Sequence, residues 1–275
     1  MAQLLLRGEP IGPTNQPIQA VLFDKDGTLS ISEPMLHALA EARVFHCLRL
    51  LAAHHPELLP EQLAEVDDLL RRAYGLDAGG VHPAGTTAVA SRSHNLISTA
   101  TTLAQVGLGW PEALALGEAV FAATDGLHGM GSPHHPQATD GLHALVAQLA
   151  TADVRCAVIS NDELAGIQAF LASQELSGHF QASWSADHSP CKPDPQAVHA
   201  LCHELGVPAG ACALIGDANS DLRMGRAAGV PVVLGYRAGW RIPPPLDAGV
   251  PFLEHWGELE VKGGPVPTPA VSTAT

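Results

Sequence analysis

The sequence predicts an α/β protein in which a parallel sheet with helices on both faces is interrupted by an all-helical insertion. From residue 137 to 234, short apolar runs rich in β-branched residues alternate with amphipathic helical patterns. Such βαβ alternation is typical of a parallel sheet that helices cover on both faces. The apolar run 18–23 resembles these strands, yet residues 32–136 carry only helical patterns. We therefore expect strand 18–23 to join the later sheet and the helical segment to be an insertion.

The insertion is predicted to contain four helices. Ser32 is a candidate N-cap of the first, with Glu33 and Pro34 in the first turn, and apolar positions follow a 3.6-residue period up to Leu51. Further helices are expected over 60–74, 86–106 and 111–124. Residues 77–85 are expected to form a loop, because glycine and proline interrupt the helical pattern there.

The segments that flank the insertion, 18–31 and 137–257, are predicted to form the α/β core. Strands are expected over 18–23, 154–159, 179–184, 211–215 and 231–234. Helices are expected over 137–150, 163–174, 195–205 and 221–228. Residues 1–17 and 258–275 are expected to be tails, because their prolines and small polar residues leave little apolar surface to bury.

Composition excludes several classes of function. The 275 residues include 28 acidic and 14 basic side chains, a formal net charge of −14, which is the opposite of the balance that nucleic-acid binding needs. No apolar stretch reaches the roughly 18 residues that span a bilayer, and the N-terminus has no signal-peptide pattern. We therefore expect a cytoplasmic protein without nucleic-acid or membrane partners; the sequence leaves its oligomeric state open.

Polar residues collect where the predicted strands end. Asp24, Asp26 and Thr28 follow the first strand, Ser160 and Asn161 follow the second, Asp217 and Asp221 follow strand 211–215, and Lys192 precedes a helix in the turn CKPDP. Because the carboxyl ends of parallel strands meet at one edge, these side chains should lie close together. Carboxylates gathered there repel one another unless a cation joins them, and oxygen ligands without histidine or cysteine favour Mg²⁺.

This set of side chains is suited to phosphoryl transfer. Asp24, which directly ends its strand, is the candidate nucleophile and would form an aspartyl-phosphate. Asp26 would protonate the leaving oxygen and later deprotonate water, and Lys192 would neutralise charge on the phosphoryl oxygens. Thr28, Ser160 and Asn161 are candidate ligands of the phosphoryl group.

Two residues outside these motifs have alternative interpretations. Arg92 is the only basic residue between Ala73 and Thr139. It would either contact a substrate carboxylate or second phosphate, or lie on a helix surface as a solvated charge. Trp240, in GYRAGWR, would either border the site or pack in the core, and packing is the default expectation for a tryptophan.

The order of the motifs resembles the haloacid dehalogenase superfamily over residues 20–235. The motifs are DKDGT after an apolar strand, a serine that ends the second strand, a lysine before proline, and GDANSD after another strand. The stretches FQASWSADHSPCKPDP and GDANSDLRMGRAAG are similar to the phosphoglycolate-phosphatase-like branch of that superfamily. The resemblance implies a Rossmann-like three-layer α/β core with parallel sheet and an inserted all-helical cap domain. It also implies that Asp24, the Asp26 carbonyl and Asp217 hold Mg²⁺. Asp221 would either bind the ion directly or contact one of its ligands.

Differences from the motifs of related enzymes exclude several possible activities. Lys25 matches the DKTGT loop of P-type ATPases, but residue 26 is aspartate and no membrane span is present. Dehalogenases of this superfamily lack the second aspartate, and phosphonatases need a cap lysine, which residues 29–139 do not contain. We therefore expect a Mg²⁺-dependent phosphatase that acts on a small anionic phosphorylated metabolite, with 2-phosphoglycolate as the first substrate to test. A β-phosphoglucomutase-like mutase and a catalytically inactive binding protein on the same scaffold are the alternatives.

Overall fold

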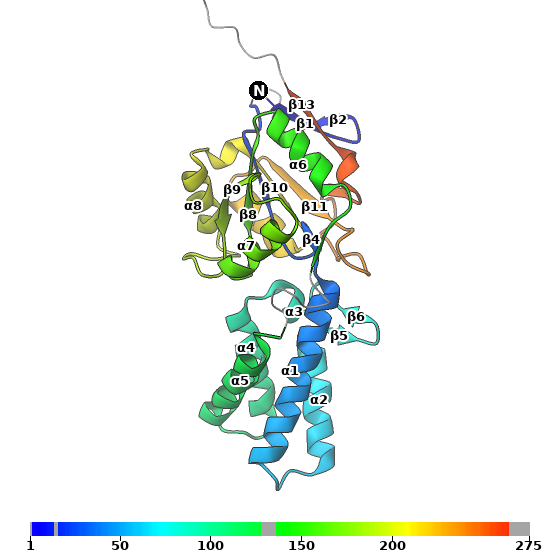
Figure 1. Cartoon of the computed structure of the whole chain (residues 1–275), viewed down its shortest axis with the longest axis vertical. Helices are drawn as coiled ribbons and strands as arrows, with labels where there is room; N and C mark the ends of the chain where they lie inside the picture. Colours follow the sequence, from blue (N-terminus) through cyan, green and yellow to red (C-terminus); the bar gives the residue numbers. More distant parts are fainter. Residues whose placement is uncertain (1, 14–15, 128–135, 264–275) are drawn as a thin grey trace, which may run out of the picture.

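The computed structural model describes residues 2–13, 16–127 and 136–263, which form two parts stacked along the long axis (Figure 1). One part contains a parallel six-stranded sheet in the order β12-β11-β10-β3-β8-β9. Its strands are β3 (Ala20–Phe23), β8 (Arg155–Ile159), β9 (Phe180–Trp184), β10 (Cys212–Gly216), β11 (Val232–Tyr236) and β12 (Phe252–Leu253). The predicted α/β class with a parallel sheet is confirmed.

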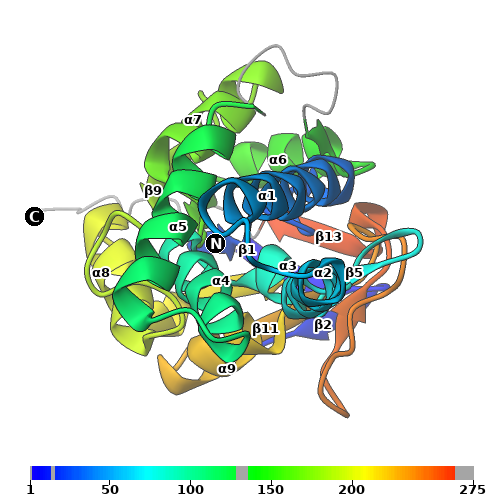
Figure 2. The ribbon, with the colours of Figure 1, turned by 90° about the horizontal axis from the view of Figure 1, so that it is seen from below.

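Helices cover both faces of this sheet, and Figure 2 shows them on opposite sides. They are α6 (Leu142–Thr151) and α7 (Leu164–Ser173) on one face, and α8 (Pro195–Leu205) and α9 (Asn219–Ala227) on the other. Successive residues of a strand point to opposite faces. Accordingly Val21 and Phe23 pack with α6 and α7, whereas Ala20 and Leu22 pack with α8 and α9. This alternation explains why the strand reads as one continuous apolar run.

The second part, which we call the cap, is built from helices that follow β3. They are α1 (Glu33–His54), α2 (Pro60–Tyr74), α3 (Thr86–Val89), α4 (Arg92–Gln105) and α5 (Trp110–Thr124). The cap has a hydrophobic cluster of its own, in which Tyr74 is fully buried and shares a 2.6 Å hydrogen bond with Thr99. The predicted loop 77–85 contains a short hairpin, β5 (Leu76–Asp77) and β6 (Gly80–Val81), so the insertion is helical but not entirely so.

The helix predicted over 86–106 is wrong in one respect, because it breaks into α3 and α4 at Ala90. The Ser91 hydroxyl accepts a hydrogen bond from the His94 N–H (3.3 Å) and so caps α4. The Asn95 amide donates to the carbonyls of Thr86 (3.0 Å) and Ala90 (3.1 Å) across the break. Serine favours an N-cap over a helix interior, so the signal for this break was in the sequence.

The two chain ends are not tails over their whole length. The strands β1 (Ala2–Leu6), β2 (Glu9–Ile11) and β13 (Leu259–Gly263) form an antiparallel sheet in the order β13-β1-β2. Leu4 is fully buried and belongs to the same hydrophobic cluster as Phe23. The prediction failed because β1 and β13 stabilise each other although residues 2–6 and 259–263 lie at opposite ends of the chain, and no local pattern reveals such a pairing. Residues after Gly263 lie outside the described part of the chain.

Two short strands connect the cap to the core. β4 (Ser30–Ile31) leads into α1, and β7 (Gln137–Ala138) returns to the core and pairs with β4 in antiparallel register. The helix expected from residue 137 therefore begins at Leu142. The remaining elements are the 3₁₀ turns η1 (Ala209–Ala211) and η2 (Trp256–Glu258). Among the described residues, no helix combines the length and apolar character that crossing a bilayer requires.

Candidate active site

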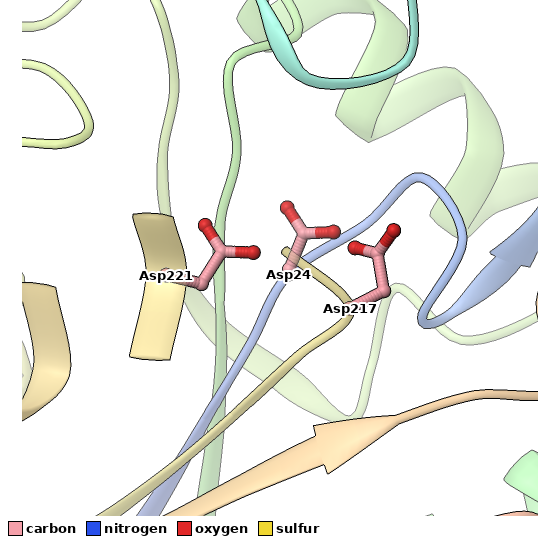
Figure 3. A group of neighbouring side chains, drawn as sticks. All are labelled: Asp24, Asp217 and Asp221. Atoms are coloured by element: carbon pink, nitrogen blue, oxygen red, sulfur yellow. The ribbon is translucent and has the colours of Figure 1, made fainter. Parts of the chain in front are cut away.

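Three buried carboxyl groups meet at the carboxyl edge of the sheet. β3 and β10 are neighbours with Phe23 opposite Ile215, so Asp24 and Asp217 leave the sheet side by side. Asp221 lies in the first turn of α9, directly after β10. One carboxyl oxygen of each of these aspartates lies within 4.8 Å of the others. Figure 3 shows the three groups pointing to the same side of their backbones.

Lys192 is the cation inside this cluster. Its ammonium binds Asp24 Oδ1 at 2.6 Å and Asp221 Oδ1 at 2.7 Å, and it donates to the carbonyl of Ile159 at 3.3 Å. Burial alone would lower the pKa of Lys192, but the charges of Asp221 and Asp24 outweigh it and raise the pKa overall. The group therefore stays positive. Three carboxylates and one ammonium give a charge of −3 + 1 = −2 when all are ionised.

That charge is poorly compensated in the protein alone. Burial is the main cause that raises the pKa of Asp24 to about 6, against the opposing charge of Lys192. Burial, followed by the charges of Asp24 and Asp221, raises the pKa of Asp217 well above its usual range. A divalent cation would balance the remaining charge, and a set of oxygen donors suits a hard ion such as Mg²⁺. The residues present therefore fit the metal that the sequence predicts.

The same electrostatics predict how the metal-free protein responds to pH. Because the pKa of Asp24 is higher in the folded state than its ordinary value of 3.8, the folded protein binds more protons between these values. The free energy of unfolding should therefore fall as pH rises from 3.8 through about 6. Asp24→Asn should raise the melting temperature at pH 7.5 in EDTA, with a gain that shrinks towards pH 4.5 because wild-type Asp24 is then protonated.

Thermal melting of both proteins across this pH range checks the effect. The matched control is Asp68→Asn, which removes an aspartate that is exposed on α2 and paired with Arg72. Its melting curve should shift little at any pH. A difference between Asp24→Asn and wild type that stays constant with pH would contradict the assigned pKa.

Asp26 lies apart from the carboxylate cluster. Its side chain pairs with the buried ammonium of Lys25 (2.6 Å) and accepts a hydrogen bond from the Ser32 hydroxyl. Burial opposes ionisation, but Lys25 and Ser32 outweigh it and lower the pKa of Asp26. Lys25 also binds Asp162 at 3.0 Å. The Asp26 side chain is thus a carboxylate held by Lys25, so any role in metal binding falls to its backbone carbonyl.

Three of the four predicted substrate ligands belong to the core and differ in their contacts. Ser160 is buried, and its hydroxyl accepts the Asp162 N–H (3.1 Å), which leaves the hydroxyl proton to donate. Thr28 is buried and donates to Asp217 Oδ1 at 3.4 Å, so in this structure its hydroxyl supports a carboxylate, and direct contact with a substrate stays a prediction. The Asn161 amide N–H donates to the Val89 carbonyl of the cap at 2.9 Å, so it joins the two parts of the chain.

Arg92 borders the site but has a counter-ion. Its guanidinium binds Asp125 Oδ2 through two nitrogens, at 2.9 and 2.5 Å, and its side chain is 38% exposed. In the structure Arg92 thus forms a partly exposed ion pair, which is nearer to a charge on a helix surface than to a substrate contact. Its charge is largely balanced by Asp125, so it is a weaker candidate for a substrate anion than the sequence implies.

A cavity of about 470 Å³ opens between the core and the cap. Its core wall contains the clustered residues Asp24, Lys192, Asp217 and Asp221, together with Ser160. Its cap wall is formed mainly by α1, α3 and α4 and includes Arg43, Thr87 and Asn95. A molecule in this cavity would contact the carboxylate cluster and the cap at the same time.

Trp240 is a site residue for which the sequence favoured simple packing. Its indole N–H donates to Asp217 Oδ2 at 2.6 Å. Gly27 makes room for this contact, since a Cβ there would collide with the indole and with Asp217, and its φ of +79° also favours glycine. Trp240 follows β11 at the carboxyl edge, so topology offered a clue to its location. The hydrogen bond orients one of the candidate metal ligands.

Replacing Trp240 with phenylalanine should therefore weaken the response to Mg²⁺. Loss of a group that orients a metal ligand typically lowers metal affinity by about 10- to 100-fold. The measurement is the Mg²⁺ concentration that gives half-maximal phosphate release and half of the metal-induced rise in melting temperature. Trp110→Phe is the control, because Trp110 is half exposed on α5 and does not line the cavity. Equal Mg²⁺ requirements in the wild type and Trp240→Phe would contradict the orienting role.

Comparisons with known proteins point to the family that the motifs resemble. A family model described as haloacid dehalogenase-like hydrolase matches residues 18–229. A phosphoglycolate phosphatase of Cupriavidus necator is 30% identical over 86% of this chain and 91% of its own length. A phosphoglycolate phosphatase of Thiobacillus denitrificans is 27% identical over 90% of this chain and 97% of its own length.

Solved structures are similar in fold. The crystal structure of a predicted phosphoglycolate phosphatase from Haemophilus somnus has a TM-score of 0.58 at 16% identity, covering 88% of this chain and 96% of the other. A phosphoglycolate phosphatase structure from Lactobacillus plantarum, itself assigned only provisionally, has a TM-score of 0.52 at 18% identity, covering 88% and 97%. At these identities the likeness concerns the arrangement of sheet and helices alone.

Proposed function

Since the chain belongs to the haloacid dehalogenase-like hydrolases, in their phosphoglycolate-phosphatase-like branch, we propose that it hydrolyses a small phosphorylated metabolite with Mg²⁺, through a phosphorylated Asp24. The observation that carries the proposal is the buried cluster in which Lys192 holds Asp24 beside Asp217 and Asp221. Its charge of −2 with all groups ionised and its oxygen donors suit one divalent ion and one phosphoryl group.

Asp24, Asp217 and Asp221 would hold the metal, with the Asp26 backbone carbonyl as a further oxygen donor. When bound, Mg²⁺ would withdraw charge from the phosphoryl oxygens and reduce their repulsion of the attacking carboxylate. Lys192 opposes the effect of burial on the Asp24 pKa and holds the carboxyl group in place through its 2.6 Å contact. Ser160 would donate its free hydroxyl proton to a phosphoryl oxygen.

The chemistry then follows in two steps. A carboxyl oxygen of Asp24 attacks phosphorus, the bond to the ester oxygen breaks, and Asp26 supplies a proton to the leaving oxygen. Water next attacks phosphorus, Asp26 takes its proton, and phosphate leaves with Asp24 restored. In this structure Lys25 holds Asp26 as a carboxylate, which suits the second step. Before the first step, Asp26 must take up a proton and leave Lys25.

Phosphoglycolate is the first substrate to test, because two of the similar curated proteins are named for its hydrolysis. The experiment measures phosphate release from a panel of phosphorylated metabolites with Mg²⁺ and with EDTA. We expect release of inorganic phosphate from at least one small ester, in Mg²⁺ only. A sugar phosphate converted to its isomer without phosphate release would instead identify a mutase, and binding of Mg²⁺ without turnover of any ester would identify an inactive scaffold.

A further inference from the structure

Three buried polar atoms in the cap lack a hydrogen-bond partner, and no other buried side-chain nitrogen or oxygen in the described part of the chain shares that property. They are Arg43 Nε, Thr87 Oγ1 and Asn95 Oδ1. The three residues are 5%, 6% and 3% exposed, and all of them line the cavity that contains Asp24. A buried polar atom without a partner destabilises a fold, so three of them in one cavity wall indicate that a ligand supplies the missing partners.

Arg43 is an incompletely paired cation. Its guanidinium carbon lies 3.8 Å from the ring centroid of Phe121, and its one ion pair with a described residue, to Asp125 Oδ1, is 3.7 Å long. Asp125 is shared with Arg92, which holds it at 2.5 Å. Two guanidinium groups thus face one carboxylate, and the Arg43 Nε proton has no acceptor. An anionic oxygen in the cavity would balance the charge of the Arg43 guanidinium and accept a hydrogen bond from its Nε.

Asn95 requires the opposite kind of partner. Its amide nitrogen donates to the carbonyls of Thr86, Ala90 and Ser91, and this fixes which end of the amide is the oxygen. The free atom is Oδ1, which only accepts hydrogen bonds. It therefore needs a donor such as a hydroxyl group. The Thr87 hydroxyl, on the neighbouring helix α3, can serve as donor or acceptor to the same group.

We propose that Arg43, Thr87 and Asn95 bind the leaving group of the substrate and select phosphate esters whose leaving group carries both an anionic oxygen and a hydroxyl. The proposal rests on the phosphatase activity proposed above. Phosphoglycolate offers a carboxylate to Arg43 but no hydroxyl to Asn95, and the cavity of about 470 Å³ has room for a larger ester. A hydroxylated relative of phosphoglycolate should therefore be the better substrate.

Four esters separate the two requirements. They are 3-phosphoglycerate with both groups, phosphoglycolate with the anion only, glycerol 1-phosphate with the hydroxyl only, and phenyl phosphate with neither. Fructose 1,6-bisphosphate, in which a second phosphate replaces the carboxylate, shows which anion the cavity takes. We expect the highest kcat/KM for an ester that carries both groups, whichever anion it has.

Substitutions of single residues test which side chains cause this substrate preference. Thr87→Val should lower kcat/KM for 3-phosphoglycerate relative to phenyl phosphate by about 5- to 30-fold, as expected for one lost hydrogen bond. Its melting temperature should stay equal or rise, since a methyl group replaces an unpaired hydroxyl. Arg43→Gln should lower the same ratio by on the order of 100-fold. The matched control is Thr102→Val in α4, whose buried hydroxyl already donates to the Ser98 carbonyl at 3.1 Å.

Binding to the Asp24→Asn protein separates failure of this inference from failure of the proposed activity. Calorimetry with 3-phosphoglycerate and phosphoglycolate on this variant needs no turnover, and tighter binding of 3-phosphoglycerate should disappear when Thr87→Val is added. Absence of hydrolysis with this binding pattern intact would reject the activity and keep the subsite. The subsite would be overturned if each variant, Thr87→Val and Arg43→Gln, lowered kcat/KM by the same factor for every ester. It would also be overturned if neither variant changed kcat/KM for any ester.

Discussion

Asp24→Asn should lose phosphate release almost completely, with a fall in kcat on the order of 10⁴-fold or more. The amide nitrogen and oxygen of asparagine are poor nucleophiles, and no other described carboxylate shares the position of Asp24 at the end of β3 beside Lys192. The measurement is steady-state phosphate release in Mg²⁺ with the best ester of the panel. This is the largest effect that we expect from any single substitution.

The loss has to be distinguished from misfolding. Asp24→Asn should fold well, because it removes one of three mutually repelling buried charges and leaves Lys192 paired with Asp221 at 2.7 Å. A melting temperature at or above that of the wild type in EDTA would show this. Asp68→Asn on the exposed surface of α2 should keep wild-type activity. Turnover within tenfold of the wild type in a pure Asp24→Asn preparation would exclude Asp24 as the nucleophile.

Removal of the metal should have the second largest effect. With EDTA, phosphate release should fall by on the order of 10³-fold, because several kcal/mol of charge stabilisation in the transition state is lost. Excess Mg²⁺ should restore it fully. Without the ion, Asp217 has no cation partner among the described side chains, although it accepts hydrogen bonds from the Trp240 indole and the Thr28 hydroxyl.

Asp217→Ala links this effect to the cluster. It should need far more Mg²⁺ than the wild type and should lose most of the rise in melting temperature that Mg²⁺ gives the wild type. The same titration on Asp68→Asn serves as the control, since that aspartate pairs with Arg72 on the surface. Undiminished turnover in excess chelator would contradict a metal-dependent reaction.

The sequence predicts the core and its chemistry because both depend on local patterns. The apolar run that ends at Asp24, the turn around Lys192 and the aspartates after strand 211–215 each carry their own signal. The rule that the ends of parallel strands meet at one edge then brings these residues together. Asp24, Lys192, Asp217 and Asp221 indeed lie in one cluster.

Features that depend on contacts across the chain could not be predicted in this way. The pairing of β1 with β13 joins residues 2–6 to residues 259–263, and neither strand has an alternating pattern strong enough to identify it. Arg43 lies in a helix whose charged positions look alike in sequence, and only the packing of Phe121 and Asp125 sets it apart. The direction in which Asp26 points depends on Lys25, whose partner Asp162 lies in a distant loop.

Detection of a phosphoryl group on Asp24 is the most direct test of the account. Acid quenching of the wild-type enzyme during turnover, followed by peptide mass spectrometry, should find one added phosphoryl group in the peptide that contains Asp24 and none in Asp24→Asn. The group should disappear as substrate is exhausted, and it should not form in EDTA. Phosphate release at full rate with no phosphorylated Asp24 at any time of quenching would contradict a covalent intermediate.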